Sequence, residues 1–313
     1  MRSLITTVFL LFCTAQAHAM GGVNPSCMAP VSGHAEPAPA IAHGFNCARI
    51  SENFGSADNI DVNQTGNLNY TWRNGSAPAP TFGYGPFLTS GEILFSPGAL
   101  KLVNTRPVIF PGLFSSWSPN SDGVETGKTF GNGVYFECNM SVDYSGATTA
   151  DLSISWSACV LSNYNIFTSN PSFCPPGGEI DNIEYIPTGN GTVNLAQGIN
   201  QFGAGSPCAG SQGTGGGTFS PNAVISGITP DNAAHTWGRL WLTAAQNGGT
   251  GLYQEYYDGL HLTTQCVTGN CDTSYTPGGN FSDVEGTQQY MALDTGVGSN
   301  FTTTFYWVHA WTR

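Results

Sequence analysis

The chain has 313 residues, only 9% of them charged, and 20 Asp and Glu against 8 Lys and Arg give a net charge of -12. This balance excludes a nucleic-acid partner, because proteins bind nucleic acid chiefly through basic residues that neutralise phosphates. The same negative charge disfavours anionic polysaccharides and favours a neutral ligand.

The N-terminus predicts a secretory signal over residues 1–19. Arg2 precedes an apolar run from Leu4 to Cys13, and the small-residue motif Ala17-His-Ala19 follows. This three-part pattern predicts a secreted, extracellular protein. The apolar run is too short to span a bilayer as a stable helix, so we expect no membrane partner.

Residues 20–42 are rich in Pro, Ala and Gly and predict an N-terminal linker or arm, and residues 43–313 predict one folded domain. We expect this domain to act as a monomer. The chain has seven Asn-x-Ser/Thr sequons. In a eukaryotic secretory pathway several of them would carry glycans on exposed loops, whereas in a bacterial protein they would mean nothing. They begin at Asn63, Asn69, Asn74, Asn139, Asn190, Asn280 and Asn300.

Eight cysteines follow the signal, and an even number in a secreted chain indicates disulfides. We expect Cys27 and Cys47 to pin the N-terminal arm, and Cys266 and Cys271 to close a hairpin loop. Metal binding is the poorer interpretation, because the chain has no Cys-x-x-Cys pair. No metal or other cofactor is therefore expected.

Period-two alternation dominates the chain, and no segment predicts a helix of useful length. Apolar residues alternate with more polar ones over 134–142 and over 152–158, and residues 302–311 are β-branched and aromatic. With 41 Gly and 19 Pro to supply turns, this pattern predicts an all-β fold, an antiparallel β-sandwich. We expect the C-terminal strand to be central in its sheet.

Three acids fall within six residues in the octet Gly-Gly-Glu-Ile-Asp-Asn-Ile-Glu at 177–184. On a strand, Glu179 and Asp181 point to the same face, whereas Glu184 would point to the other. One β-bulge would absorb a residue and bring Glu184 back to the first face. Two carboxyls on one surface are what glycosidic bond cleavage requires. The alternatives are an acidic strand on a solvated face and a cluster of calcium ligands.

This octet resembles the active-site strand of glycoside hydrolase family 16, in its bulged variant. Four further stretches resemble motifs of that family in the expected order: Phe130–Glu137, His235–Trp241, Tyr256–Gly259 and Leu293–Gly298. The resemblance spans roughly residues 45–313. It implies a jelly-roll, concanavalin A-like sandwich with a concave substrate cleft, and it makes residues 43–313 the catalytic domain.

The resemblance also implies a role for each acid. Glu179 would be the nucleophile, Glu184 the acid and base, and Asp181 would hold Glu179 by a hydrogen bond. The chain is then expected to be a secreted retaining endo-glycosidase that hydrolyses a neutral β-glucan, with β-1,3 or mixed β-1,3/1,4 linkages, through a covalent intermediate. A transglycosylase, a non-catalytic glycan-binding module and a polysaccharide lyase are the alternatives.

Two further residues are candidate substrate-binding groups. Trp156 resembles a tryptophan of the family that stacks on sugar rings, with core packing as the alternative. His235 resembles a histidine near the cleft, with a buried structural role as the alternative. Around Trp156 the chain departs from the family at Ser157, which replaces Pro, and at Val160, which replaces a second Trp. Two other departures are Asn182, which replaces an apolar residue and is expected to hydrogen-bond irregular backbone at the bulge, and Asp294, which replaces Asn.

Overall fold

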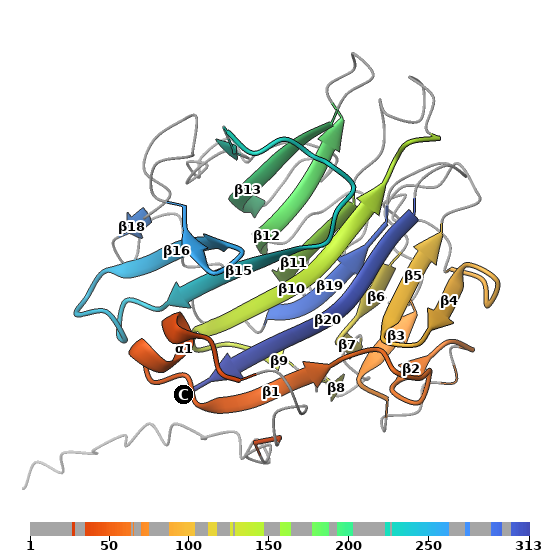
Figure 1. The fold of residues 1–313 in the computed structure, drawn as a ribbon. Helices are drawn as coiled ribbons and strands as arrows, with labels where there is room; N and C mark the ends of the chain where they lie inside the picture. Colours follow the sequence, from red (N-terminus) through yellow and green to blue (C-terminus); the bar gives the residue numbers. More distant parts are fainter. Residues whose placement is uncertain are drawn as a thin grey trace, which may run out of the picture.

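The computed structural model describes residues 27–28, 35–63, 65, 70–74, 88–103, 112–117, 126–127, 129–146, 157–163, 177–187, 193–202, 223–225, 227–262, 273–275, 289–295 and 302–313. In this part of the chain the fold is a β-sandwich of two nine-stranded sheets, with one short helix, α1 (Ala38–Ala42). Figure 1 shows the two sheets packed face to face. The predicted fold class is confirmed.

Sheet A contains, in spatial order, β17 (Leu260–His261), β16 (Gly251–Tyr257), β15 (His235–Leu242), β10 (Val134–Asp143), β20 (Thr302–Thr312), β5 (Ala99–Val103) and β4 (Ile93–Ser96), with β1 (Cys47–Glu52) beside β20 and β18 (Thr273–Tyr275) beside β16. The C-terminal strand β20 pairs with β10, β5 and β1, so its predicted central place is confirmed.

Sheet B contains β14 (Ala223–Val224), β13 (Val193–Phe202), β12 (Gly177–Pro187), β11 (Ser157–Asn163), β19 (Gln289–Asp294), β6 (Gly112–Phe114), β3 (Trp72–Asn74) and β2 (Ile60–Asp61), with β9 (Thr129–Phe130) beside β19. A separate pair is formed by β7 (Ser116–Trp117) and β8 (Thr126–Gly127). The pairing is antiparallel except between β2 and β3, whose two short strands run parallel.

The core lies between the inner faces of the two sheets. The apolar residues of 134–142 all enter it, as the alternation on β10 predicts. The hairpin from β16 to β17 turns at Asp258 and Gly259, both at positive φ, which suits an Asp-Gly pair in a tight turn. The stretch Tyr256–Gly259, which resembles a motif of the family, therefore leads into a hairpin in the structure.

The outer face of sheet A carries a second apolar cluster, which α1 covers. Ala40 of α1 and Phe45 are fully buried there, in one cluster with Tyr135 and Trp311. Residues 38–42, at the end of the predicted linker or arm over 20–42, form this helix. The sequence shows no periodicity here because a five-residue helix presents too few positions to establish one.

Two disulfides lie among the described cysteines. Cys27–Cys47 is confirmed and ties the N-terminal arm to β1. The second bridge, Cys138–Cys159, joins β10 of sheet A to β11 of sheet B, with Cα atoms 6.7 Å apart. Cys266 and Cys271 fall outside the described residues, so their pairing stays a prediction.

Replacing both Cys138 and Cys159 with Ala is expected to lower the free energy of unfolding by about 3 kcal/mol, because a loop of this length is closed in the unfolded chain. Thermal melting should then show a Tm lower by roughly 5–10 °C. The Cys27/Cys47 double Ala variant is a matched control, since the two bridges close loops with sequence separations of 20 and 21. A larger loss at Cys138/Cys159 would reflect packing lost at two buried positions. Equal losses of unfolding free energy in the two variants would mean that loop closure in the unfolded chain accounts for the whole effect of each bridge.

Among the described sequons, Asn74 cannot carry a glycan. Its side chain is 1% exposed, and its amide nitrogen donates to the carbonyl oxygens of Leu88 and Val62. Asn74 is therefore not among the sequons that could carry a glycan on an exposed loop, because it ends the buried strand β3. Asn63 is exposed and still fits the prediction.

Candidate active site

The acidic strand β12 contains the predicted β-bulge. On the β13 side, Asp181 pairs with Gly198 and Glu184 with Ala196, so two residues of β12 oppose one residue of β13. On the β11 side the ladder also shifts at the residue after Asp181. The extra residue is Asn182.

The bulge places Asp181 and Glu184 on one face of sheet B. Ile180 and Ile183, which flank them, lie in the core between the sheets, so the two acids point away from sheet A. Asp181 is fully buried and Glu184 is 5% exposed. Buried carboxylates act in a low dielectric, where their electrostatic interactions are stronger than in water.

The residues beside these acids are small. Ala158 and Ala196 lie opposite Glu184 on the neighbouring strands, and Val160 and Gly198 lie opposite Asp181. Directly opposed residues share a face, so the carboxylates are the longest groups on this part of the sheet.

Asp294 is a third acid on this face, and the sequence motifs do not assign it a role. It lies opposite Ala158, which in turn lies opposite Glu184, so one strand separates the two acids. A Cβ on its other neighbour, Gly112, would collide with the Asp294 carboxylate and the Leu293 carbonyl. Gly112 thus gives Asp294 its space. The signal that could have drawn attention to Asp294 is its departure from the family motif, which has Asn at this position.

For two predicted site residues the structure describes no side chain. For Glu179 the backbone is placed in β12, opposite Ser162 of β11, and its side chain is not described. Trp156 falls entirely outside the described residues, one position before β11 begins. Their roles as nucleophile and sugar platform stay predictions.

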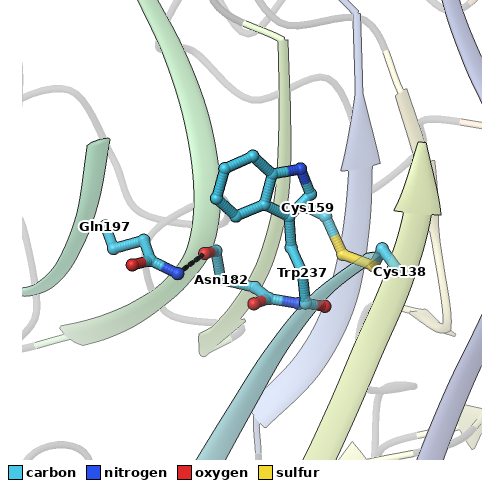
Figure 2. Close-up of a disulfide and its surroundings, with 5 residues drawn as sticks. All are labelled: Cys138, Cys159, Asn182, Gln197 and Trp237. Carbon is cyan, nitrogen blue, oxygen red and sulfur yellow. Dashed lines mark hydrogen bonds between the residues drawn. A yellow bond between two sulfur atoms is a disulfide. The ribbon is translucent and has the colours of Figure 1, made fainter. Parts of the chain in front are cut away.

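Side chains around the bulge bind its backbone (Figure 2). The amide nitrogen of Gln197, the β13 residue that faces the bulge, donates to the carbonyl of Asn182 at 2.8 Å. The Asn182 side chain in turn donates to the Trp237 carbonyl on β15 at 2.7 Å. Asn182 was expected to bond irregular backbone at the bulge, whereas its side chain reaches across to sheet A.

An ion pair of sheet A contacts the backbone of the bulge. Arg239 Nη1 donates to the carbonyl of Asp181 and lies 2.7 Å from Glu255 Oε1 on the neighbouring strand β16. Arg239 is 1% exposed and Glu255 is 4% exposed. The Arg239 guanidinium also lies over the Tyr253 ring, 5.7 Å from the ring centroid.

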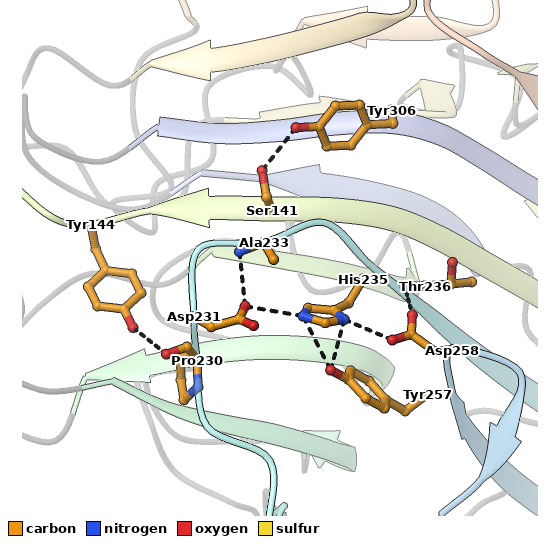
Figure 3. Close-up of polar contacts among 10 residues, drawn as sticks. All are labelled: Ser141, Tyr144, Pro230, Asp231, Ala233, His235, Thr236, Tyr257, Asp258 and Tyr306. Carbon is orange, nitrogen blue, oxygen red and sulfur yellow. Dashed lines mark hydrogen bonds and ion pairs between the residues drawn. The ribbon is translucent and has the colours of Figure 1, made fainter.

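The structure does not bring His235 to these acids. His235 begins β15 in sheet A, whereas Asp181 and Glu184 face away from sheet A. Its ring nitrogens lie 2.8 Å from Asp258 Oδ2 and 3.1 Å from Asp231 Oδ1, and the Tyr257 hydroxyl lies 2.8 Å from Nδ1 (Figure 3). Burial lowers the pKa of His235, but hydrogen bonds to the two aspartates outweigh it and the pKa is raised. These contacts fit the structural alternative.

Glu137, a buried carboxyl with a raised pKa, lies on the outer face of sheet A. Burial raises its pKa to about 7, against the opposing effect of a hydrogen bond from the Tyr135 hydroxyl at 3.1 Å. Gly238 and His309 lie opposite it on the neighbouring strands. A perturbed acid often marks a catalytic site, but Glu137 points away from sheet B.

Glu137 predicts a pH-dependent stability. Its folded pKa lies above the unfolded value near 4.5, so stability is full below pH 4.5 and is lost as the pH rises through 7. At about 1.4 kcal/mol per pKa unit, the loss is roughly 3 kcal/mol. Glu137→Gln should therefore match the wild type at pH 4 and exceed it at pH 8 in urea denaturation. If the difference in unfolding free energy between the variant and the wild type were the same at pH 4 and pH 8, this assignment would be contradicted.

Among the described side chains, no three His, Cys, Asp or Glu gather as metal ligands would. Within the same part of the chain, no helix is long and apolar enough to cross a membrane.

No protein-family model matches the sequence, and no curated protein matches it. Solved structures with a similar fold include porphyranase B from Zobellia galactanivorans, which is 14% identical, with 92% of this chain and 99% of that chain covered and a TM-score of 0.40. A non-specific endo-β-1,3(4)-glucanase of family GH16 is 13% identical, with coverages of 78% and 88% and a TM-score of 0.42. The alginate lyase Aly36B is 13% identical, with coverages of 72% and 86% and a TM-score of 0.44.

Glycoside hydrolases of family 16 are thus among the solved structures that this chain resembles. All three TM-scores lie below 0.5, so these likenesses do not by themselves assign the chain an activity.

Proposed function

We propose that the chain is a secreted, retaining endo-glycosidase that hydrolyses a neutral β-glucan with β-1,3 or mixed β-1,3/1,4 linkages. The observation that carries the proposal is the bulge in β12, which puts Asp181 and Glu184 on one face of sheet B despite their odd spacing. A strand that merely presented acids to solvent would not need its register broken. The small residues around them fit a site that admits a ligand.

The proposed reaction has two steps. In the first, the Glu179 carboxylate attacks the anomeric carbon while Glu184 donates a proton to the departing glycosidic oxygen, which leaves a glycosyl ester on Glu179. In the second, Glu184 takes a proton from water, the water oxygen attacks the anomeric carbon, and the ester bond to Glu179 breaks. Retention requires the two carboxyls to lie about 5–5.5 Å apart. Asp181, between them in sequence, would hydrogen-bond to Glu179 and fix its rotamer.

The overall charge supports a neutral substrate. With a net charge of -12, the chain repels polyanions at long range, whereas a neutral glucan meets no such barrier. A uronate lyase would need cations at its site, and the Arg239 cation instead faces Glu255 in the interior.

The test is sugar release by the purified protein from laminarin, lichenan, xyloglucan and agarose, with porphyran and alginate added. Release from laminarin or lichenan, with the β-anomer formed first in proton NMR, would support the proposal. An α-anomer formed first would contradict retention. Unsaturated products from alginate, seen by ultraviolet absorbance, would indicate a lyase instead.

Two alternatives share the same fold. A transglycosylase would pass the glycosyl group to an acceptor sugar, which would appear as products longer than the substrate. A glycan-binding module would bind these polysaccharides without releasing sugar.

A further inference from the structure

The bulge in β12 is one of two registers that the strand could adopt. Side chains alternate, so a slip by one residue after Asp181 would turn Glu184 into the core and Ile183 out of it. The bulged register keeps the acids together, but it interrupts the backbone ladder at Asn182. Other groups must then satisfy the backbone of this segment.

Two side-chain donors do this, one from β13 and one from sheet A, and a third bond anchors the bulge. Gln197 donates to the Asn182 carbonyl from β13, and Arg239 donates to the Asp181 carbonyl from sheet A. The Asn182 side chain anchors the extra residue to the Trp237 carbonyl. Gln197 and Asn182 are fully buried and Arg239 is 1% exposed, so water does not compete for these bonds.

The same contacts discriminate against the slipped register. After a slip, Asn182 would move to the register position of Ile183, opposite Cys159, and the Gln197 amide would face a regular strand. Both changes would leave buried polar groups without these bonds, which is costly. The Cys138–Cys159 bridge holds the two sheets together beside this point, because Cys159 pairs with Ile183 and Cys138 with Trp237.

We propose that Asn182, Gln197 and Arg239 are positioning residues for catalysis: they clamp β12 in the bulged register. The clamp sets the distance and direction of Glu184 relative to Asp181 without touching the substrate. This inference rests on the proposed function, since positioning is defined by the reaction that it serves.

The test compares Gln197→Met and Asn182→Leu with the wild type, since both variants keep side-chain volume and remove one bond of the clamp. With a cleaved polysaccharide, kcat should fall about 10- to 100-fold while KM stays within about twofold, because a misplacement of about 1 Å costs on this order. The pH limits of kcat/KM should shift as well. A purely structural role would lower Tm and leave kcat of the folded protein unchanged.

Thr303→Val is the matched control. Thr303 is fully buried and donates to the Ser157 hydroxyl at 2.9 Å, another bond between the two sheets that does not involve β12. This variant should lose stability and keep kcat. A Thr303→Val variant as slow as Gln197→Met would overturn the proposal, because any buried bond between sheets would then have the same effect.

A readout without substrate separates the clamp from the proposed function. Amide hydrogen exchange at residues 181–185 should be about tenfold faster in the two clamp variants than in Thr303→Val, at temperatures equally far below each Tm. Equal exchange would overturn the clamp whatever the activity. A wild type without sugar release, together with faster exchange in the variants, would contradict the proposed function and support the clamp on the register.

Discussion

Glu179→Gln is expected to abolish sugar release, while the protein keeps its Tm and its affinity for the polysaccharide. An amide is a poor nucleophile, so the glycosyl ester cannot form. Glu184→Gln removes the proton donor and should lower kcat by about 10²- to 10⁴-fold. Reducing-sugar release and calorimetric melting on the same preparations would measure both effects.

Azide distinguishes the two roles. With Glu184→Ala, azide should replace water in the second step and yield a glycosyl azide that retains the β-configuration. With Glu179→Ala, azide would occupy the position of the nucleophile and yield the α-azide. Exchanged outcomes would reverse the assignments of the two glutamates.

Glu137→Gln is the matched control, because it removes a buried carboxyl of sheet A that faces away from the site. It should keep full activity near pH 6. Loss of activity in this variant, or unfolding of Glu179→Gln, would show that the carboxylates are needed for the fold.

The bulge could be predicted from the sequence because spacing and alternation conflict there. Glu179 and Asp181 have the same parity and Glu184 the opposite one, so placing all three on one face required one extra residue. The structure places that residue at Asn182, the polar residue between two isoleucines. Alternation on β10 predicted its core face for the same physical reason.

The supports of the bulge could not be predicted in this way. Gln197 and Arg239 lie 15 and 58 residues from their acceptors, and neither has a local pattern that marks it. Pairing of strands distant in sequence determines which buried polar group meets which carbonyl. The place of His235 could not be predicted for a related reason, because alternation along its strand does not reveal which sheet carries the acids.

Arg239→Met is expected to lower the free energy of unfolding by about 3–5 kcal/mol, because it leaves Glu255 buried without the Arg239 cation. The effect should appear as a lower midpoint in urea denaturation at an unchanged slope. The variant should also lose activity, since the Asp181 carbonyl loses its donor from sheet A. Stability and activity therefore fall together in the single variant.

The double variant Arg239→Met/Glu255→Met separates the two effects. Replacing both members of a buried ion pair with apolar side chains is often neutral for stability, so most of the lost free energy should return. Activity should stay low, because the second substitution restores no donor to Asp181. Recovery of both would mean that Arg239 acts only through the folding of sheet A, and the clamp would then consist of Gln197 and Asn182 alone.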